Sequence, residues 1–310
     1  MGKKVALVLG SGGARGLAHI GAIEALEARG YTISSIAGCS MGSIIAGMYA
    51  AGELKKAKEW FLQVDKQLIL RMMDINLFSG NSLVKGEKII QELQKVVPDR
   101  PIEELNIPCS IVASDMMNTE EVIFRSGSLF EAVRASISIP LFFQPVQIGN
   151  RLLIDGGILN PLPLHAVTRT EGDILVAMDI SGKDSMPKED MPEPIDVEGR
   201  LKSLTDSGIP VPKALESQLR QLGKRVDEVR TKRAADLGRS VNFVKMLDRM
   251  SDMQIQQNTM LACMLTPPDV KATMRQYAYN TFDFDKAEEI IEQGYVLMSQ
   301  ALDRIASGGK

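Results

Sequence analysis

Apolar runs and one-sided apolar faces alternate along the first part of the chain. Residues 5–9 form a continuous apolar run, typical of a strand that is covered on both faces. In residues 17–29 the apolar side chains recur with the period of a helix. A second short run, 33–37, precedes small and apolar residues at 43–51 that suit a packed helix. This pattern predicts two consecutive strand–helix units.

Further apolar stretches predict the rest of a sheet. The residues at 108–115, 121–124 and 174–179 have strand character, and the apolar stretch 151–154 ends at an aspartate. Strands that alternate with helical patterns are typical of an α/β fold with a parallel sheet.

Composition narrows the class of protein. The chain has 310 residues, 45% of them hydrophobic, which is enough for one large domain with a sizeable core. Its 36 basic and 39 acidic residues give a net charge of −3, so the overall charge lacks the basic balance of a nucleic-acid-binding protein. Cys39, Cys109 and Cys263 are scattered and odd in number, which favours free thiols in a reducing compartment.

The N-terminus resembles a signal peptide only superficially. Its apolar run stops after Leu9 at a glycine-rich stretch, and no stretch of the sequence approaches the length of a membrane span. We therefore expect a cytoplasmic protein.

The stretch Gly38–Gly42 is a candidate nucleophile elbow. A serine in a sharp turn between a strand and a helix needs glycines two residues to either side, and Ser40 has both. Cys39 is a weaker alternative, because an elbow presents its central residue.

The stretch Gly10–Gly16 is a second glycine-rich turn between a strand and a helix. Free backbone N–H groups in such a loop hold negative charge, either a phosphate or a transient oxyanion. A dinucleotide site is disfavoured, because Arg15 occupies the sixth position and the third glycine arrives one residue late at Gly16.

A serine nucleophile needs a base. Neither of the two histidines, His19 and His165, stands in an obvious triad arrangement, so we interpret both as structural. Asp155 ends a predicted strand and is followed by two glycines, and its carboxylate could accept the serine proton. Asp115 and Asp179 also end predicted strands, but they lack the Gly-Gly turn and are interpreted as structural.

Together these blocks resemble the patatin-like phospholipase family, in particular its bacterial cytosolic members related to the catalytic domain of neuropathy target esterase. The likeness covers Gly10–Gly16, Gly38–Gly42, Ala135–Pro140 and Asp155–Gly157, in the same order and at the same spacing. It implies a three-layer α/β fold with a largely parallel central sheet and a helical insertion. Ser11 stands where many relatives carry glycine.

The resemblance also implies a catalytic apparatus. Ser40 would be the nucleophile and Asp155 the base of a Ser-Asp dyad that uses no metal or cofactor. The backbone N–H groups of Gly12, Gly13 and Ala14 would form the oxyanion hole, braced by Arg15. The remaining motif glycines are Gly10, Gly16, Gly38, Gly42, Gly156 and Gly157.

We expect one hydrolase domain over residues 1–310, with an acidic linker and amphipathic helix inserted at 183–250. In residues 213–239, apolar side chains at 4-3-4-3 spacing form a seam flanked by basic residues. This seam has three readings: packing on its own domain, self-association, or contact with an anionic membrane. The resemblance resumes near 267–270 and 282–285, as the last strand and the start of the C-terminal helix.

The expected activity is hydrolysis of carboxylic esters in lipids. The apolar stretch 68–80 fits either an acyl channel or ordinary core. The partners implied are a lipid or ester substrate and no nucleic acid, while peripheral membrane contact and a homo-oligomer are left open. The alternative from another class is a non-catalytic scaffold that acts through the inserted helix.

Overall fold

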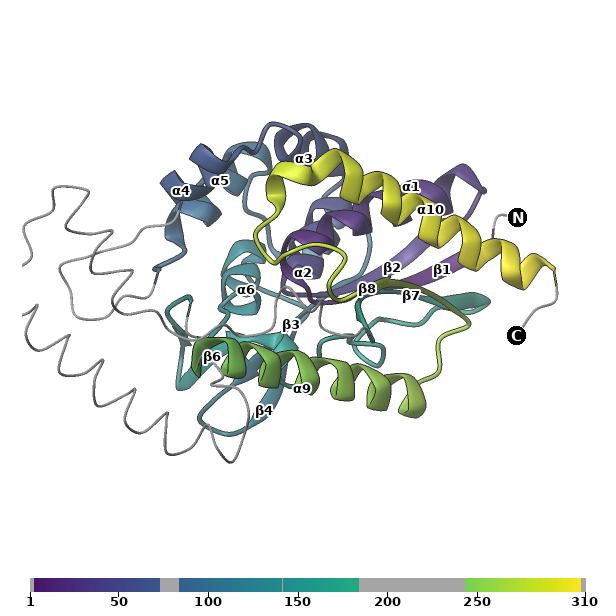
Figure 1. Cartoon of the computed structure of the whole chain (residues 1–310). Helices are drawn as coiled ribbons and strands as arrows, with labels where there is room; N and C mark the ends of the chain where they lie inside the picture. The colour runs from purple at the N-terminus through teal and green to yellow at the C-terminus, as the bar shows by residue number, and fades with distance from the viewer. Residues whose placement is uncertain (1–2, 73–83, 141, 184–242, 308–310) are drawn as a thin grey trace, which may run out of the picture. The chain divides into compact units, whose positions relative to one another are not determined.

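The computed structural model describes most of the chain. The ranges described are 3–72, 84–140, 142–183 and 243–307 (Figure 1). Residues 1–185 and 253–310 group into one compact unit, and residues 186–252 into a second. The amphipathic stretch 213–239 lies outside the described residues. So do residues 73–80 of the apolar stretch 68–80, for which the sequence predicts either an acyl channel or ordinary core.

The described residues of the first unit contain a central sheet of eight strands. The strands are β1 (Lys4–Leu9), β2 (Thr32–Cys39), β3 (Cys109–Asp115), β4 (Glu120–Phe124), β5 (Val146–Ile148), β6 (Arg151–Asp155), β7 (Asp173–Gly182) and β8 (Val270–Arg275). Their order is β5-β6-β3-β2-β1-β7-β8, and β4 pairs with β3 outside this path. The five strands from β3 to β8 in this order pair in parallel, whereas the pairs that involve β4, β5 and β6 are antiparallel. The predicted largely parallel sheet is confirmed.

Helices connect the strands. The longer ones in the described ranges are α1 (Ala18–Ala28), α2 (Met41–Ala50), α3 (Leu54–Phe61), α4 (Lys66–Met72), α5 (Glu87–Val96), α6 (Leu129–Ser136), α9 (Phe243–Leu265) and α10 (Ala287–Ala306). Short 3-10 turns occupy η1 (Gly13–Leu17), η2 (Ile102–Glu104), η3 (Gly156–Ile158) and η5 (Phe284–Lys286). The two predicted strand–helix units correspond to β1 with α1 and β2 with α2. None of these helices is both long and apolar enough to span a membrane.

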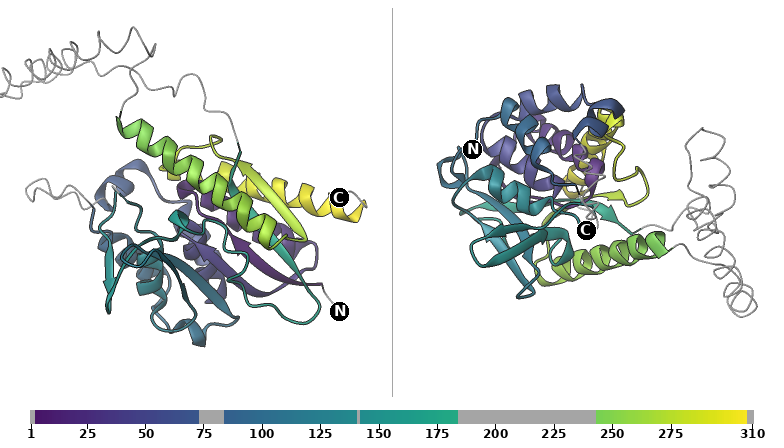
Figure 2. Two further views of the ribbon diagram at one scale, coloured as in Figure 1. Left: turned by 90° about the horizontal axis from the view of Figure 1, so that it is seen from below. Right: turned by 90° about the vertical axis from the view of Figure 1, so that its left-hand side faces the viewer.

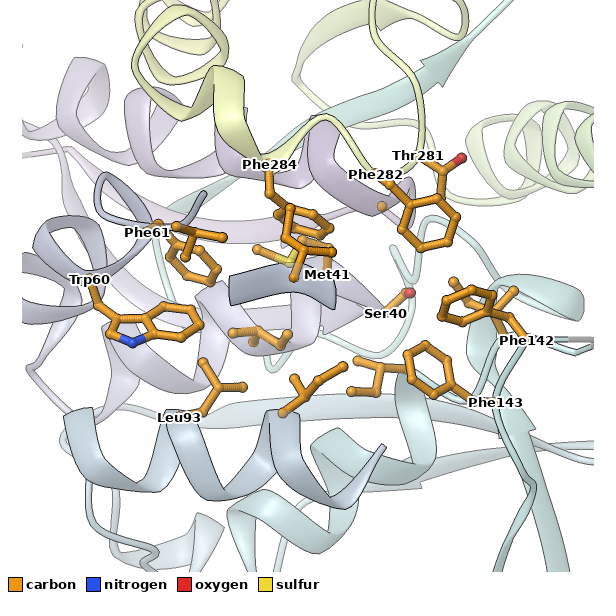
Figure 3. A pocket seen from close by; sticks show the side chains of 17 residues that line it. Ser40, Met41, Trp60, Phe61, Leu93, Phe142, Phe143, Thr281, Phe282 and Phe284 are labelled. Atoms are coloured by element: carbon orange, nitrogen blue, oxygen red, sulfur yellow. The ribbon is translucent and has the colours of Figure 1, made fainter. Parts of the chain in front are cut away.

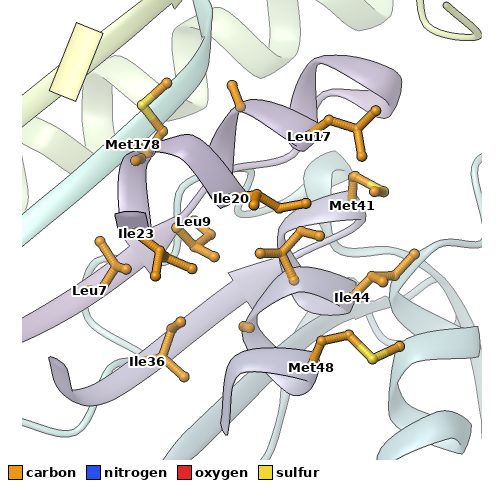
Figure 4. Packing of buried hydrophobic residues seen from close by; sticks show 14 of the residues in the cluster. Leu7, Leu9, Leu17, Ile20, Ile23, Ile36, Met41, Ile44, Met48 and Met178 are labelled. Atoms are coloured by element: carbon orange, nitrogen blue, oxygen red, sulfur yellow. The ribbon is translucent and has the colours of Figure 1, made fainter. Parts of the chain in front are cut away.

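The two faces of the sheet are covered by different segments. Successive side chains of β1 point to opposite faces, so Leu7 and Leu9 pack with Ile20 and Ile23 of α1 in the larger core cluster (Figure 4). Ala6 and Val8 face the other way, toward residues 162–167 and the C-terminal half of α9. Figure 2 shows the part of α9 that belongs to the first unit, residues 253–265 in green, on the opposite side of the sheet from α10, in yellow. Full burial of an apolar side chain contributes about 1.5–3 kcal/mol, so both coverings stabilise the sheet.

Two glycines allow α10 to lie directly on α1. A Cβ placed on Gly294 of α10 would lie 2.0 Å from the Ala18 carbonyl oxygen, and one placed on Gly21 of α1 would lie 1.9 Å from the Ile291 carbonyl oxygen. The helix backbones are therefore in contact. This crossing matters for the site, because α10 begins directly after the segment that lies over the loop preceding α1.

We expect Gly294→Ala to lower the free energy of unfolding by about 2 kcal/mol, because an added methyl group forces two packed backbones apart. Thermal or urea unfolding followed by circular dichroism measures the change. Gln300→Ala, at an exposed position of the same helix, serves as the control and should leave stability within about 0.5 kcal/mol. Equal stability of the Gly294→Ala and control proteins would contradict the close crossing.

Candidate active site

Ser40 lies at the turn between β2 and α2. Its backbone has a φ of 54° and a ψ of −123°, a conformation that residues other than glycine rarely adopt. The flanking glycines make the turn possible. A Cβ on Gly38 would lie 2.2 Å from the Gly42 carbonyl oxygen, and a Cβ on Gly42 would lie 2.3 Å from the Leu9 carbonyl oxygen. The strand–serine–helix context that an elbow requires is therefore present.

The sheet brings Asp155 to Ser40. Cys39, at the end of β2, is paired with Val112 of β3, and the next residue of β3, Ala113, is paired with Asp155 of β6. The Ser40 hydroxyl donates a hydrogen bond to Asp155 Oδ2 at 2.6 Å. The other carboxylate oxygen, Oδ1, accepts the Gly157 N–H at 2.7 Å, which fixes the orientation of the carboxylate.

Burial changes the acidity of this carboxylate. Ser40 is 3% exposed and Asp155 is 4% exposed. Desolvation raises the pKa of Asp155 to about 6, while the hydrogen bonds from Ser40 and Gly157 act in the opposite direction. Asp155 is therefore ionised at neutral pH, yet it is a stronger base than an exposed aspartate.

Two serines of the 135–140 block hold the pair in place, a role that the sequence analysis did not assign. Ser136 Oγ accepts the Ser40 backbone N–H at 2.8 Å and donates to the Val112 carbonyl oxygen at 2.6 Å. The Ser138 carbonyl oxygen accepts the Asp155 N–H at 2.9 Å. The sequence marks this block only through the family resemblance, which gives no indication of its partners.

The loop of the first glycine motif lies beside the elbow. Its start is fixed by hydrogen bonds from the Gly10 N–H to the Met178 carbonyl oxygen at 3.1 Å and from the Ser11 N–H to the Pro161 carbonyl oxygen at 2.8 Å. Gly13 has a φ of 58°, which favours glycine.

The three expected oxyanion donors differ in their contacts. The Ala14 N–H donates to the Thr281 carbonyl oxygen at 2.9 Å, so this donor is engaged in the structure as it stands. Gly12 and Gly13 show no such backbone hydrogen bond to other described residues. These two N–H groups remain candidates for holding a negative oxygen.

Arg15 is buried beneath this loop. Its Nε donates to the Ile180 carbonyl oxygen and one terminal nitrogen donates to the Tyr279 carbonyl oxygen, both at 2.9 Å. A guanidinium with two carbonyl partners on different segments has the geometry that the expected bracing role requires.

The remaining motif glycines allow close approaches between segments. A Cβ on Gly16 would lie 2.2 Å from the Met41 side chain, and one on Gly156 would lie 2.3 Å from the Val112 carbonyl oxygen. A Cβ on Gly157 would lie 2.8 Å from Ser11 Oγ. At Gly10 the nearest such contact, to the Met178 carbonyl oxygen, would be a less severe 3.2 Å.

The two histidines are engaged elsewhere. His19 Nε2 donates to the Gly10 carbonyl oxygen at 2.8 Å, and complete burial lowers the pKa of His19 to about 4, so its ring is neutral at pH 7. His165 Nε2 lies 2.7 Å from Glu121 Oε2 at an exposed position. Neither ring has a hydrogen bond to Ser40 or Asp155 in the described part of the chain.

The structure also accounts for Cys39, Asp115 and Asp179, which the sequence offered as alternative catalytic residues. Burial, with Asp155 nearby, raises the pKa of the Cys39 thiol, which keeps it protonated and a poor nucleophile. Asp115 accepts the Met117 N–H and the Asn118 amide, and so holds the turn between β3 and β4. Asp179 accepts the Ser181 N–H and lies 3.6 Å from Lys271 Nζ.

An apolar pocket opens at Ser40 (Figure 3). It encloses about 780 Å³ of empty space, including the part open to solvent. Ile69 of α4 contributes to its wall, so one described residue of the apolar stretch 68–80 does face the pocket. The lining residues are Gly13, Ser40, Met41, Ile44, Trp60, Phe61, Val64, Ile69, Ile89, Leu93, Ile137, Ile139, Phe142, Phe143, Thr281, Phe282 and Phe284.

Comparison with known proteins identifies relatives of this chain. "Uncharacterized NTE family protein Rv1063c" of Mycobacterium tuberculosis (strain H37Rv) is 42% identical over 187 residues, which are 60% of this chain and 52% of the relative. "Patatin-like phospholipase domain-containing protein 6" of Homo sapiens is 32% identical over 190 residues, which are 59% of this chain and 14% of the relative. The chain therefore spans about half or less of the length of these relatives.

A solved structure, VipD from Legionella pneumophila, aligns with a TM-score of 0.43 at 14% identity, over 97% of this chain and 67% of that one. The family described as "Patatin-like phospholipase" matches residues 7–168, which include the elbow, the glycine loop and Asp155. Because this match covers more than half of the sequence, the chain belongs to the patatin-like phospholipase family.

Proposed function

We propose that this protein hydrolyses carboxylic esters of lipids, with Ser40 as the nucleophile and Asp155 as the base. The observation that carries the proposal is the 2.6 Å hydrogen bond from the Ser40 hydroxyl to Asp155 at one side of an apolar pocket. Membership of the patatin-like phospholipase family supports a lipid as the source of the ester.

In the first half of the reaction, Asp155 takes the proton of Ser40 while the serine oxygen attacks the ester carbonyl carbon. Negative charge then develops on the carbonyl oxygen. We assign the stabilisation of this charge to the N–H groups of Gly12 and Gly13 and to the N-terminus of α2, which follows Ser40 directly. The alcohol leaves with the proton that Asp155 returns to it.

In the second half, a water molecule replaces the alcohol. Asp155 removes a proton from the water as it attacks the acyl group on Ser40. Asp155 then returns this proton to Ser40 Oγ as the bond to the acyl carbon breaks and the carboxylic acid leaves. The same carboxylate serves both halves, so the mechanism needs no third catalytic side chain. The apolar walls of the pocket suit a hydrocarbon acyl group, because burying it there removes it from water.

We expect Ser40→Ala to lose ester hydrolysis and labelling by a fluorophosphonate probe while the protein stays folded. The hydroxyl is the reacting group, and alanine adds no bulk to the turn. Mass spectrometry of the labelled site and a pH-stat assay measure the two effects. An unlabelled wild-type protein without esterase activity would instead favour the non-catalytic scaffold.

We expect kcat/KM to rise with pH through about 6 and then level off, because Asp155 acts as a base only when it is ionised. Asp155→Asn should remove most activity. His165→Gln, a polar change at an exposed histidine, is the control and should retain activity. A pH–rate profile without a limb near pH 6 would contradict the assignment of the base.

Asp155→Asn should also change the stability of the fold in a pH-dependent way. The pKa of Asp155 is higher in the folded protein than in the unfolded chain, so its contribution to stability is fully present below pH 3.8 and is lost as pH rises to about 6. A shift of this size corresponds to about 3 kcal/mol at neutral pH. Asp155→Asn should therefore raise the melting temperature more at pH 8 than at pH 4.5.

We expect Gly13→Ala to lower kcat by about 100-fold, which is the effect of losing one oxyanion donor. The Cβ added at Gly13 would lie 2.6 Å from the Thr281 methyl group, and Gly13 itself has a φ of 58°. Gly30→Ala is a matched control, because Gly30 also has a positive φ, of 75°, with no atom within 4 Å of the added Cβ. If both variants lose the same amount of activity, backbone strain alone explains the result.

A further inference from the structure

The pocket extends to two sides of Ser40. Trp60, Phe61 and Leu93 bound one side of it, and the rings of Phe142 and Phe282 lie beside Ser40 on the other (Figure 3). When a serine attacks an ester carbonyl, the acyl chain and the alcohol extend in different directions from the reacting carbon. Each part of the substrate therefore meets a different wall.

Phe142 and Phe282 form one continuous aromatic wall although they are far apart in sequence. Their ring centroids are 4.7 Å apart at an interplanar angle of 38°, and Phe142 also makes an edge contact with Phe143 at 4.8 Å. Phe282 is 40% exposed, so its ring borders both the pocket and solvent.

The segment that carries Phe282 is fixed to the glycine loop. Thr281 accepts the Ala14 N–H through its carbonyl oxygen, and its side chain lies against Gly13. Two residues earlier, the Tyr279 carbonyl oxygen accepts a hydrogen bond from Arg15. The position of Phe282 is thereby set by the same loop that contains the expected oxyanion donors.

The segment is also held by its own contacts. The Asp283 carboxylate accepts the Asn280 N–H at 3.2 Å and lies 2.8 Å from Lys286 Nζ. The Tyr279 hydroxyl contacts Glu289 and Gln293 of α10 at 2.9 and 2.8 Å. Phe282 is therefore part of a preorganised turn that is attached to α10.

We propose that Phe282, together with Phe142, is the specificity-determining wall for the alcohol part of the ester, and that it limits the bulk of the leaving group. The inference rests on the proposed ester hydrolysis at Ser40. The side bounded by Trp60, Phe61 and Leu93 takes the acyl chain, because its walls are the more buried: Phe61 is 3% and Leu93 1% exposed, against 40% for Phe282. The alcohol then lies beside the ring pair. Phe142 lies within residues 7–168 and Phe282 outside them, so the wall combines a ring from the matched stretch with one from beyond it.

Three monomeric substrates separate the two sides of the site. Ethyl butanoate and glycerol tributanoate share an acyl group and differ in the alcohol, while ethyl octanoate shares the alcohol of the first and has a longer acyl chain. All are assayed below their solubility limits, and kcat/KM is measured for the wild-type protein and for Phe282→Ala, Phe142→Ala and Trp60→Ala.

For Phe282→Ala we expect the ratio of kcat/KM for glycerol tributanoate to that for ethyl butanoate to rise about 10-fold, with the octanoate-to-butanoate ratio changed less than about 2-fold. Phe142→Ala should give the same pattern, because it removes the partner ring. Trp60→Ala should change the acyl ratio and leave the alcohol ratio unchanged. Phe282→Leu, which keeps an apolar wall, should stay close to the wild type.

A shift in the acyl ratio, or in neither ratio, for a folded Phe282→Ala protein that still hydrolyses ethyl butanoate would overturn this inference and leave the proposed function standing. Failure of the wild-type protein to hydrolyse any of the three esters, with Ser40 unlabelled by the fluorophosphonate probe, would overturn the proposed function itself. Melting temperatures of all variants establish that the comparison is made on folded protein.

Discussion

The elbow depends on backbone contacts that leave no room for side chains. Gly38 lies against Gly42, and Gly42 lies against the carbonyl oxygen that ends β1. These approaches let a parallel strand turn directly into α2 with Ser40 at a positive φ. The glycine loop 10–16 follows β1 at the same edge of the sheet, so its distance from the serine is set by the same contacts. The Ser40 hydroxyl therefore points at the Asp155 carboxylate because three glycine-containing turns pack tightly: the loop 10–16, the elbow 38–42 and the turn 155–157.

The burial that raises the pKa of Asp155 also makes its ionised form costly to the fold. Its raised pKa reflects a charge kept away from water, with one serine hydroxyl and one backbone N–H as its main compensation. Active sites commonly store such unfavourable free energy, which the surrounding packing offsets. In this protein the offset comes from a sheet whose central strands are covered on both faces.

Local patterns predicted the fold and the central pair of residues, because these depend on short-range signals. Continuous apolar runs marked the covered strands, and glycines at fixed spacing marked the elbow around Ser40 and the turn after Asp155. The contacts of Ser136 and of Thr281 could not be predicted in this way. Both act largely through single hydrogen bonds between segments distant in sequence, and a serine or a threonine carries no pattern that names its partner. The same holds for the pairing of Phe142 with Phe282, which joins two loops with no shared periodicity.

The pairing of β1 with β7 bears on how far this chain can be shortened. The stretch that matches the family ends at residue 168, before β7 begins at Asp173. A fragment cut at that point would keep Ser40, Asp155 and the glycine loop, but β1 would lose the neighbour that satisfies one side of its backbone. An open apolar strand of this kind is a template for edge-to-edge aggregation. A shortened chain must therefore keep the strands and helix of the C-terminal part. These elements cover the edge of β1 and also supply part of the pocket wall.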